Sequence, residues 1–462
     1  MQIKRNFLTL ALSVAAGVSM AQSVTVNSVG GADYTSISAA LAAVQANAAG
    51  PDVITIQNAG PFAEAGQLLI NGDATDNELT IQASAGVRPL VISSFNGDGA
   101  IYVNKNNKTT VKDLILIPGL VAAGVAPQSA IMCNEETGAT NMEVVLQNIL
   151  ISSNNGANQP LASLDGLTPV TIDPLTMISF RDEGVYVQSS PDTMLYKITC
   201  EDVIVSGLFG DSGSDAFRTL QDGAAGSEFT VGPGCVASFN YSATATNAAL
   251  QPGGNEGSVL VQIKGTSAKP VKFINNTLRG FYSTNTTVAG STKNIEWAII
   301  TGNSGSGFEA GDSDENVTFS NVTIANNAKP LVATAAFASS YTMNNVIVAG
   351  NGTEGVDNTI NVSTSAAGTL TANNSAFVLA GAYKLDTTNF DLDGLDDNTP
   401  TSNVTKTAVI GADPDFASLD PANANFGVVK NVAYATAGPG GTPLTGGGTY
   451  NPTAAVADWS IY

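Results

Sequence analysis

One short pattern recurs along the chain. It consists of alternating apolar positions, an Asn, two further apolar positions, and a polar segment that ends in Asn or Gly. It reads VTFSNVTIANN from Val317 and YTMNNVIVAGNG from Tyr341. The position shared by the related segments falls at the following residues: Asn148, Asp202, Asn275, Ile299, Asn321, Asn345 and Asn374. From residue 275 onward the spacings are 24, 22, 24 and 29 residues, so the chain repeats a unit of that length.

The apolar runs inside each unit indicate strands. They are too short for helices, are rich in Val and Ile, and are separated by Gly, Asn, Ser and Thr. A unit of 22 to 29 residues with two such runs is typical of one coil of a β-solenoid, in which stacking buries the apolar face that one coil leaves exposed. We predict an all-β solenoid of roughly a dozen parallel coils. It spans residues 53–437, with an irregular acidic insertion near 385–400.

The recurrent Asn predicts a structural ladder. An Asn side chain tolerates left-handed backbone angles at a bend, and its amide can donate to the Asn of the next coil. We expect Asn321 and Asn345 to be buried, one coil apart, and bonded along the axis. This interpretation assigns the repeated Asn to stability rather than to ligand binding.

Both ends of the solenoid are predicted to be capped, because terminal coils expose an apolar core and unpaired strand edges. Residues 22–52 form the N-terminal cap, in which the segment from Ser36 to Ala48 places Ile37, Leu41 and Val44 on one helical face. Residues 438–462 are expected to form a loose, glycine-rich C-terminal tail.

The first 21 residues predict an exported protein. Lys4 and Arg5 precede an apolar stretch from Phe7 to Val18, and small residues lead up to Ala21, as in a secretory signal peptide. We expect a secreted or cell-surface location. No later stretch approaches the ~20 apolar residues of a membrane span, so we expect none.

Composition excludes several classes of function. A net charge of −21 argues against a nucleic-acid partner. The absence of His excludes Ser-His-Asp and Cys-His nucleophiles and His-bearing zinc sites. Three widely spaced cysteines, Cys133, Cys200 and Cys235, allow at most one disulfide and are predicted to be small buried side chains.

Three segments carry a resemblance to a known family. They are ADYTSISAALAAV with the following DVITIQNAGPFAEAGQLLI, the central coils with Asn at one corner, and ADPDFASLDPANANFGVV. The chain resembles the right-handed parallel β-helix proteins of the pectate-lyase-like superfamily. In this resemblance Phe62 and Glu64 stand where the family often has Tyr and Glu, and the third segment corresponds to the last coil.

The resemblance implies a secreted protein with a single right-handed parallel β-helix and a short N-terminal capping helix. It does not imply one activity, because the fold hosts lyases, hydrolases, epimerases, adhesins and proteins without catalysis. The family's Gly-His-Gly motif is impossible without His, and 18 basic residues in 462 suit a polyuronate cleft poorly.

Three carboxylates are candidates for catalysis: Asp182, Asp211 and Asp215. Asp182 lies 29 residues before Asp211, about one coil, so the two side chains could stack on one face. A glycosidase needs two carboxylates roughly 5–10 Å apart, and Arg218 could keep one of them ionised.

The segment NFDLDGLDD is a candidate calcium site. Asn389, Asp391, Asp393 and Asp397 offer oxygen ligands around a turn-forming Gly, as in calcium loops. The spacing departs from an EF-hand at its twelfth position, Pro400, where a bidentate Glu belongs. If the site forms, calcium raises the melting temperature. Calorimetry with and without chelator checks this, and equal melting temperatures would contradict it.

Two functions fit the sequence. The first is an exported, non-catalytic β-helix with an adhesive or matrix role, whose partners are extracellular glycans or cell-surface components. The alternative is a glycoside hydrolase that acts on a neutral glycan through the paired carboxylates. Trp297 occupies an apolar coil position and is predicted to lie in the core, whereas Phe281, Tyr282 and Phe308 are candidates to line a groove.

Overall fold

A computed structural model of the chain provides the structure. It describes the following residues: 21–46, 50–71, 78–95, 97–104, 108–119, 129–135, 141–152, 183–189, 195–210, 215–220, 224, 226–242, 248–253, 259–277, 279–283, 291–310, 315–337, 340–349, 361–364, 369–378, 383–385, 388–390, 404–407, 416–418, 426–437, 443–451 and 453.

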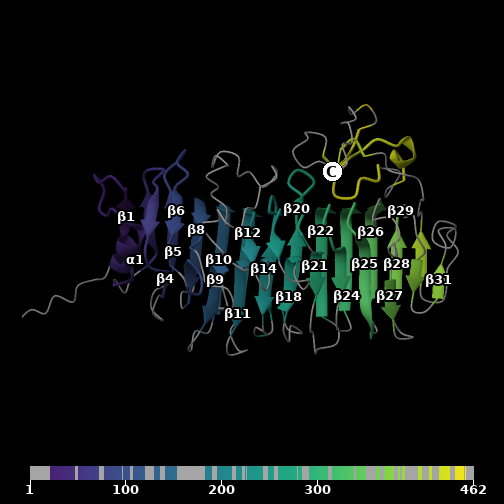
Figure 1. Ribbon diagram of the computed structural model, residues 1–462, viewed down its shortest axis with the longest axis horizontal. Helices are drawn as coiled ribbons and strands as arrows, with labels where there is room; N and C mark the ends of the chain where they lie inside the picture. Colours follow the sequence, from purple (N-terminus) through teal and green to yellow (C-terminus); the bar gives the residue numbers. More distant parts are fainter. Residues whose placement is uncertain are drawn as a thin grey trace, which may run out of the picture.

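The described strands stack into one long parallel solenoid, which runs from the helix α1 at one end to β31 at the other (Figure 1). The strands of successive coils pair in parallel. The exception is the pair β30–β31, which is an antiparallel hairpin. The prediction of an all-β fold with stacked parallel coils is confirmed. Among these residues, no helix has the length and hydropathy that a bilayer crossing requires.

Most described strands belong to two sheets. The first contains β1 (Ser23–Val26), β2 (Asp52–Ile56), β3 (Phe62–Glu64), β5 (Leu79–Ala83), β6 (Leu90–Ser93), β8 (Lys108–Ile117), β10 (Asn141–Ile151), β12 (Leu195–Ser206), β15 (Ser227–Val231), β16 (Val236–Ser238), β19 (Val259–Lys264), β20 (Val271–Ile274), β22 (Ser291–Thr301), β24 (Glu315–Ala325), β26 (Ser340–Ala349), β28 (Thr369–Asn373), β29 (Ala376–Val378) and β32 (Val404–Thr407). The second contains β4 (Leu68–Ile70), β7 (Ile101–Val103), β9 (Ser129–Glu135), β11 (Glu183–Ser189), β14 (Asp215–Leu220), β18 (Ala248–Gly253), β21 (Arg279–Ser283), β23 (Ser306–Ala310), β25 (Lys329–Phe337), β27 (Asn361–Thr364), β30 (Tyr383–Leu385) and β31 (Thr388–Phe390).

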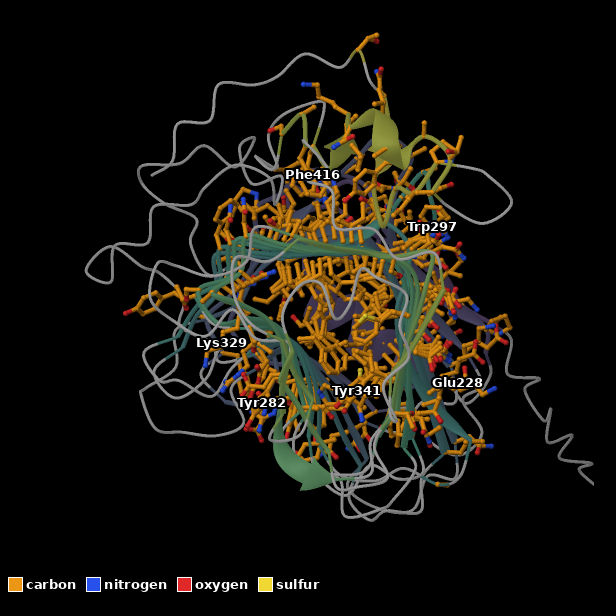
Figure 2. All side chains as sticks on the ribbon, turned by 90° about the vertical axis from the view of Figure 1, so that its right-hand side faces the viewer. Glu228, Tyr282, Trp297, Lys329, Tyr341 and Phe416 are labelled. Carbon is orange, nitrogen blue, oxygen red and sulfur yellow. The ribbon has the colours of Figure 1, made fainter. Side chains whose placement is uncertain are left out.

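Seen end on, the coils enclose one apolar core with three outer faces (Figure 2). The first face, on the right with Glu228, is the outer side of β15, β19 and the first halves of the long strands. The second face, on top beneath Phe416, is formed by β16, β20 and the second halves. The third face, with Tyr282, is the outer side of the second sheet.

Residues with left-handed backbone angles separate the first face from the second. At this first bend φ is positive at the following residues: Asp113, Asn148, Asp202, Trp297, Asn321, Asn345 and Asn374. The strand register corrects the sequence assignment of Ile299. Glu296 pairs with Ser320 and Ala298 with Val322, so Trp297, and not Ile299, is the counterpart of Asn321.

The second bend closes the second face. It contains Phe239, Asn275 and Asn326, all with positive φ. The pairing of Ile274 with Thr301 places Asn275 opposite Gly302 at this bend, which corrects its assignment to the first one. Asn therefore recurs at both bends because both need a left-handed residue, and that double occurrence explains the error.

The buried asparagine ladder directly follows the second bend. The Nδ2 atom of Asn240 donates to Oδ1 of Asn276 at 2.9 Å, that of Asn276 to Asn303 at 2.9 Å, and that of Asn303 to Asn327 at 2.8 Å. All four side chains are buried. The prediction of a ladder is confirmed, but its buried members are not the residues that the repeat alignment selected.

The first bend carries a second, more exposed row of Asn and Asp side chains that are bonded between coils. Asn345 donates to Asn321, one coil away, as predicted. Both side chains are only half-buried, however, so the prediction that they are buried is wrong. In an earlier coil Asn148 donates to Asp113 at 2.8 Å.

The helix α1 (Ile37–Gln45) caps the first coils, as the sequence predicted (Figure 1). Ser36 is its N-cap, and its side chain accepts from the amide of Ala39. The buried carboxylate of Glu64 in β3 accepts the amide of Ile37 at 2.7 Å. A carboxylate at a helix N-terminus satisfies free amides and opposes the helix dipole, so Glu64 fixes the cap on the first coil.

The described residues between 416 and 450 pack over the second face rather than continuing the stack (Figure 2). Phe416, Tyr434 and Leu444 bury the outward side chains of Ile347 and Ala325. Within the segment β33 (Val428–Val429) pairs with β34 (Thr449–Tyr450), next to a 3₁₀ turn at Val432–Tyr434. The likeness of this region to a last coil is therefore misleading. The described part of the glycine-rich tail, residues 443–451, is packed rather than loose.

Glycine allows this tail to approach the sheet closely. A Cβ atom on Gly447 would overlap the carbonyl group of Ala298, and the Gly447 amide donates to Oγ1 of Thr323 at 3.1 Å. We expect Gly447→Ala to detach the tail, to lower the free energy of unfolding by roughly 2 kcal/mol or more, and to speed proteolysis within 416–450. Limited proteolysis and thermal melting check this. Gly66→Ala is the control because open space surrounds that position, and equal behaviour of the two variants would contradict the packing.

The three cysteines are free and buried, as predicted. Burial raises the pKa of the Cys133 thiol and of the Cys235 thiol to about 12. We expect an aromatic disulfide reagent to label none of the three in the folded protein, and all of them in denaturant, because the thiolate is the reactive form. Rapid labelling of any cysteine in the native state would contradict the burial.

Candidate functional site

A shallow groove of about 600 Å³ lies on the first face, across β12, β15, β19 and β22. It reaches from the middle of the face to the first bend, where Trp297 forms its edge (Figure 2). Its lining combines carboxylates, hydroxyl groups, an amide and one aromatic ring: Thr199, Glu201, Glu228, Thr230, Gly232, Pro233, Gln262, Lys264, Gly265, Thr266, Ser267, Glu296 and Trp297.

Strand alternation turns these side chains outward. In β19 (VLVQIK) the odd positions Val259, Val261 and Ile263 are buried, so Gln262 and Lys264 point to solvent. The parallel register then aligns outward residues of successive coils into files. Thr199 pairs with Thr230, which pairs with Gln262. The floor of the groove is therefore a row of neutral hydrogen-bonding groups.

Trp297 is the unusual member of the groove. Its φ of 48° is left-handed, where the other residues of the first bend are Asn or Asp. A bulky residue in this region is a genuine outlier, and such strain persists where the surrounding structure or the function requires it. The ring is half-buried and lines the groove. The prediction that Trp297 lies in the core is therefore wrong.

The groove contains charged side chains of both signs, and some of them interact with neighbouring side chains. Glu201 accepts from Nε2 of Gln147 at 3.2 Å, and Lys264 lies beside Glu296 on the neighbouring coil. Just outside the lining, Lys269 donates to Asp202 of the first bend at 2.7 Å. The hydrogen bond and the charge of that carboxylate raise the pKa of Lys269.

The three Glu residues of the groove stand at separate positions along and across the first face. Lys197 pairs with Glu228, so Glu201 lies four residues farther along the strand, about 13 Å away at ~3.3 Å per residue. Glu296 is three coils from Glu201, roughly 14 Å at ~4.8 Å per strand. Glycosidase carboxyl groups lie ~5–10 Å apart. The backbone spacing of these residues exceeds that separation.

Of the catalytic candidates, Asp215 lies within the described residues, and its side chain is buried beneath the third face. Its Oδ1 accepts the amide of Ala248 at 2.8 Å, and its Oδ2 lies 3.6 Å from Nη1 of Arg218. The same nitrogen donates to Glu183 at 2.8 Å, on the neighbouring coil. Burial lowers the pKa of Arg218, but the charges of Asp215 and Glu183 outweigh it and raise that pKa overall. Asp215 thus belongs to a buried ionic cluster.

Asp182 and Asp211 lie outside the described residues, so their convergence with Asp215 stays a prediction. The calcium candidates Asp391, Asp393 and Asp397 lie outside them too, and Asn389 falls in β31. Within the part of the chain that the structure describes, no group of three or more acidic or thiol side chains is arranged to hold a metal ion.

The aromatic candidates separate into two groups. Phe281 and Phe308 stack in the core with ring centroids 4.9 Å apart, so they line no groove. Tyr282 lies on the third face beneath Arg279, whose Cζ is 4.0 Å from the ring centroid. Arg279 in turn pairs with Glu309 at 2.7 Å.

Sequence reasoning missed the groove because its carboxylates come from separate coils. Glu201, Glu228 and Glu296 lie 27 and 68 residues apart in the sequence, and the segments between their coils differ in length. One signal was present. Aligning the bends by their flanking apolar residues places Trp297 in the Asn position, and a Trp there has no structural advantage.

Comparison with known families supports the architecture. The sequence profile of the family described as right handed beta helix region matches residues 259–404, which begin in β19 and end in β32. Comparison with curated proteins and with solved structures finds no significant match. The strands described before residue 259 repeat the parallel pairing of the matched region. The protein is therefore a right-handed parallel β-helix.

Proposed function

We propose that this chain is an exported, non-catalytic β-helix protein that binds neutral extracellular glycans in the groove on its first face. A rigid, in-register sheet holds the lining side chains in fixed relative positions. Binding sites that are formed in advance lose little entropy when the ligand arrives.

The strained Trp297 is the observation that carries the proposal. Asn or Asp at the other positions of the first bend avoids most of the cost of left-handed angles, which is roughly 1–2 kcal/mol for an ordinary residue. A strained aromatic ring at the edge of a groove supports a role of that ring in binding. A flat ring can cover the apolar face of a sugar, and the hydroxyl and amide groups below can bond its edges.

The charge of the protein supports a neutral ligand. The chain carries −21 overall, and the groove contains three carboxylates for one ammonium group. An acidic polysaccharide would be repelled over long distances at low salt. An uncharged glycan meets no such barrier, and its hydroxyl groups can donate hydrogen bonds to the carboxylates.

A panel of soluble glycans tests the proposal. We expect neutral polysaccharides to retard the protein in affinity electrophoresis, acidic ones to have no effect, and the amount of reducing sugar to stay constant. Glu228→Gln should weaken binding about tenfold, because a neutral amide accepts a weaker hydrogen bond than a carboxylate. Glu143→Gln, which changes an exposed carboxylate of β10 outside the groove, is the control. Release of reducing ends, or no retardation by any neutral glycan, would contradict the proposal.

A further inference from the structure

The first face changes in character along the axis. Its earlier coils carry charged side chains such as Lys112, Glu201 and Lys264. Beyond β22 the outward side chains in the first halves of β24, β26 and β28 are uncharged. They form what we name the grid: Asn316, Thr318, Ser320, Ser340, Thr342, Asn344, Thr369, Thr371 and Asn373. All nine are exposed or half-exposed, and the described residues of the tail pack on the adjacent second face.

The grid is regular in two directions. Its middle file runs from Thr318 through Thr342 to Thr371, each residue paired with the next. The flanking files follow the same register. Neighbours lie ~4.8 Å apart along the solenoid and ~6.6 Å apart along each strand. Parallel strands in one continuous register keep this surface flat.

The grid side chains are held in place. Nδ2 of Asn373 donates to Oδ1 of Asn344 at 3.0 Å, and Oγ1 of Thr369 donates to Oγ of Ser340 at 3.1 Å. Beneath the grid, the alternate residues of the same strands are packed in the core, where the ring of Phe319 lies 5.2 Å from that of Phe308 in β23. These bonds and the packed layer beneath favour a preorganised surface.

The chemistry of the grid selects its occupant. A charged ligand finds no counter-charge among the nine side chains. A single glycan chain finds no aromatic ring among the nine side chains, whereas Trp297 lies at the groove. The matching surface is flat, uncharged and rich in donors and acceptors, and it repeats in two dimensions at about the spacing of the coils. The oxygen lattice of crystalline water has these properties.

We propose that the grid binds ice. The threonine hydroxyl and methyl groups together order water at lattice-like intervals, so the bound water joins the growing crystal and pins its surface. This function goes beyond glycan binding and does not depend on the groove. It needs no bond to form or break.

Ice recrystallisation inhibition and thermal hysteresis of the purified full chain test this proposal. We expect measurable activity for the natural sequence, and loss of about tenfold or more for Thr342→Lys, because a long charged side chain at the centre separates the two surfaces. Thr318→Lys is the second variant. Thr110→Lys is the matched control, since Thr110 lies in the same file but in β8, far from the grid.

The outcomes separate ice from other occupants. Full activity in Thr110→Lys and in a Trp297→Asn variant, with loss in both grid variants at unchanged melting temperature, supports ice binding. If ice recrystallises in a solution of the natural protein as fast as in a solution of serum albumin, the proposal is overturned. Binding to crystalline chitin or cellulose that is lost in Thr342→Lys, without any effect on ice, also overturns it and assigns the grid to a crystalline glycan.

Discussion

Replacing Trp297 by Asn is expected to weaken glycan binding about 30-fold while leaving the fold intact. Loss of the ring removes the aromatic edge of the groove, which we expect to cost about 2 kcal/mol, or roughly 30-fold in Kd. The free energy of unfolding should change by no more than ~1 kcal/mol, because relief of the left-handed strain offsets the lost packing of a half-buried ring. Isothermal titration with a neutral polysaccharide and urea unfolding measure the two effects.

Phe239 supplies the matched control. Among the residues that the structure describes, it is the other bulky aromatic residue with a left-handed φ, 53°, and it lies at the second bend, away from the groove. Phe239→Asn should change stability to a similar extent and leave glycan affinity unchanged. If Trp297→Asn binds as the natural protein does, the strained ring is not part of a binding site.

Replacing Asn276 by Leu is expected to cause the largest loss of stability. Oδ1 of Asn276 accepts from the amide and the side chain of Asn240, and its Nδ2 donates to Ala237 and Asn303. Leu removes all four bonds at a buried site. At roughly 1–3 kcal/mol for each buried group left without its partner, we expect a loss of about 3–5 kcal/mol in urea unfolding.

Asn373→Leu is the control for the ladder. It removes one bond, from Nδ2 of Asn373 to Asn344 on the half-exposed first face, where water can replace the lost partner. We expect a change below ~0.5 kcal/mol. Equal losses in the two variants would show that the ladder after the second bend contributes no more than a surface amide.

The fold was readable from the sequence because its signals agree with one another. The repeated apolar runs, the Ala-rich cap around Leu41 and the polar bends all indicate stacked coils. The exact register was not readable. Asn satisfies the left-handed angles of both bends, so an alignment on Asn alone moved Asn275 to the wrong bend and placed Ile299 where Trp297 stands.

The candidate site was largely unreadable for a related reason. Glu201 and Glu228 come to line the same groove only through the register of separate coils, and no local motif marks either residue. Trp297 was predicted in the core because alternation predicts side-chain direction within strands and not at a bend. Asp215 was correctly placed beside Arg218, but the structure shows a buried cluster there rather than a surface cleft.

The fluorescence of Trp297 during glycan titration tests the central claim most directly. The chain contains two tryptophans, so Trp459→Phe leaves Trp297 as the single reporter. If neutral glycans bind in the groove, saturating polysaccharide will shift the Trp297 emission to shorter wavelength and protect it from iodide quenching, because the ring loses contact with water. A glycan that binds while the emission and quenching of Trp297 stay constant would contradict the assignment of the groove.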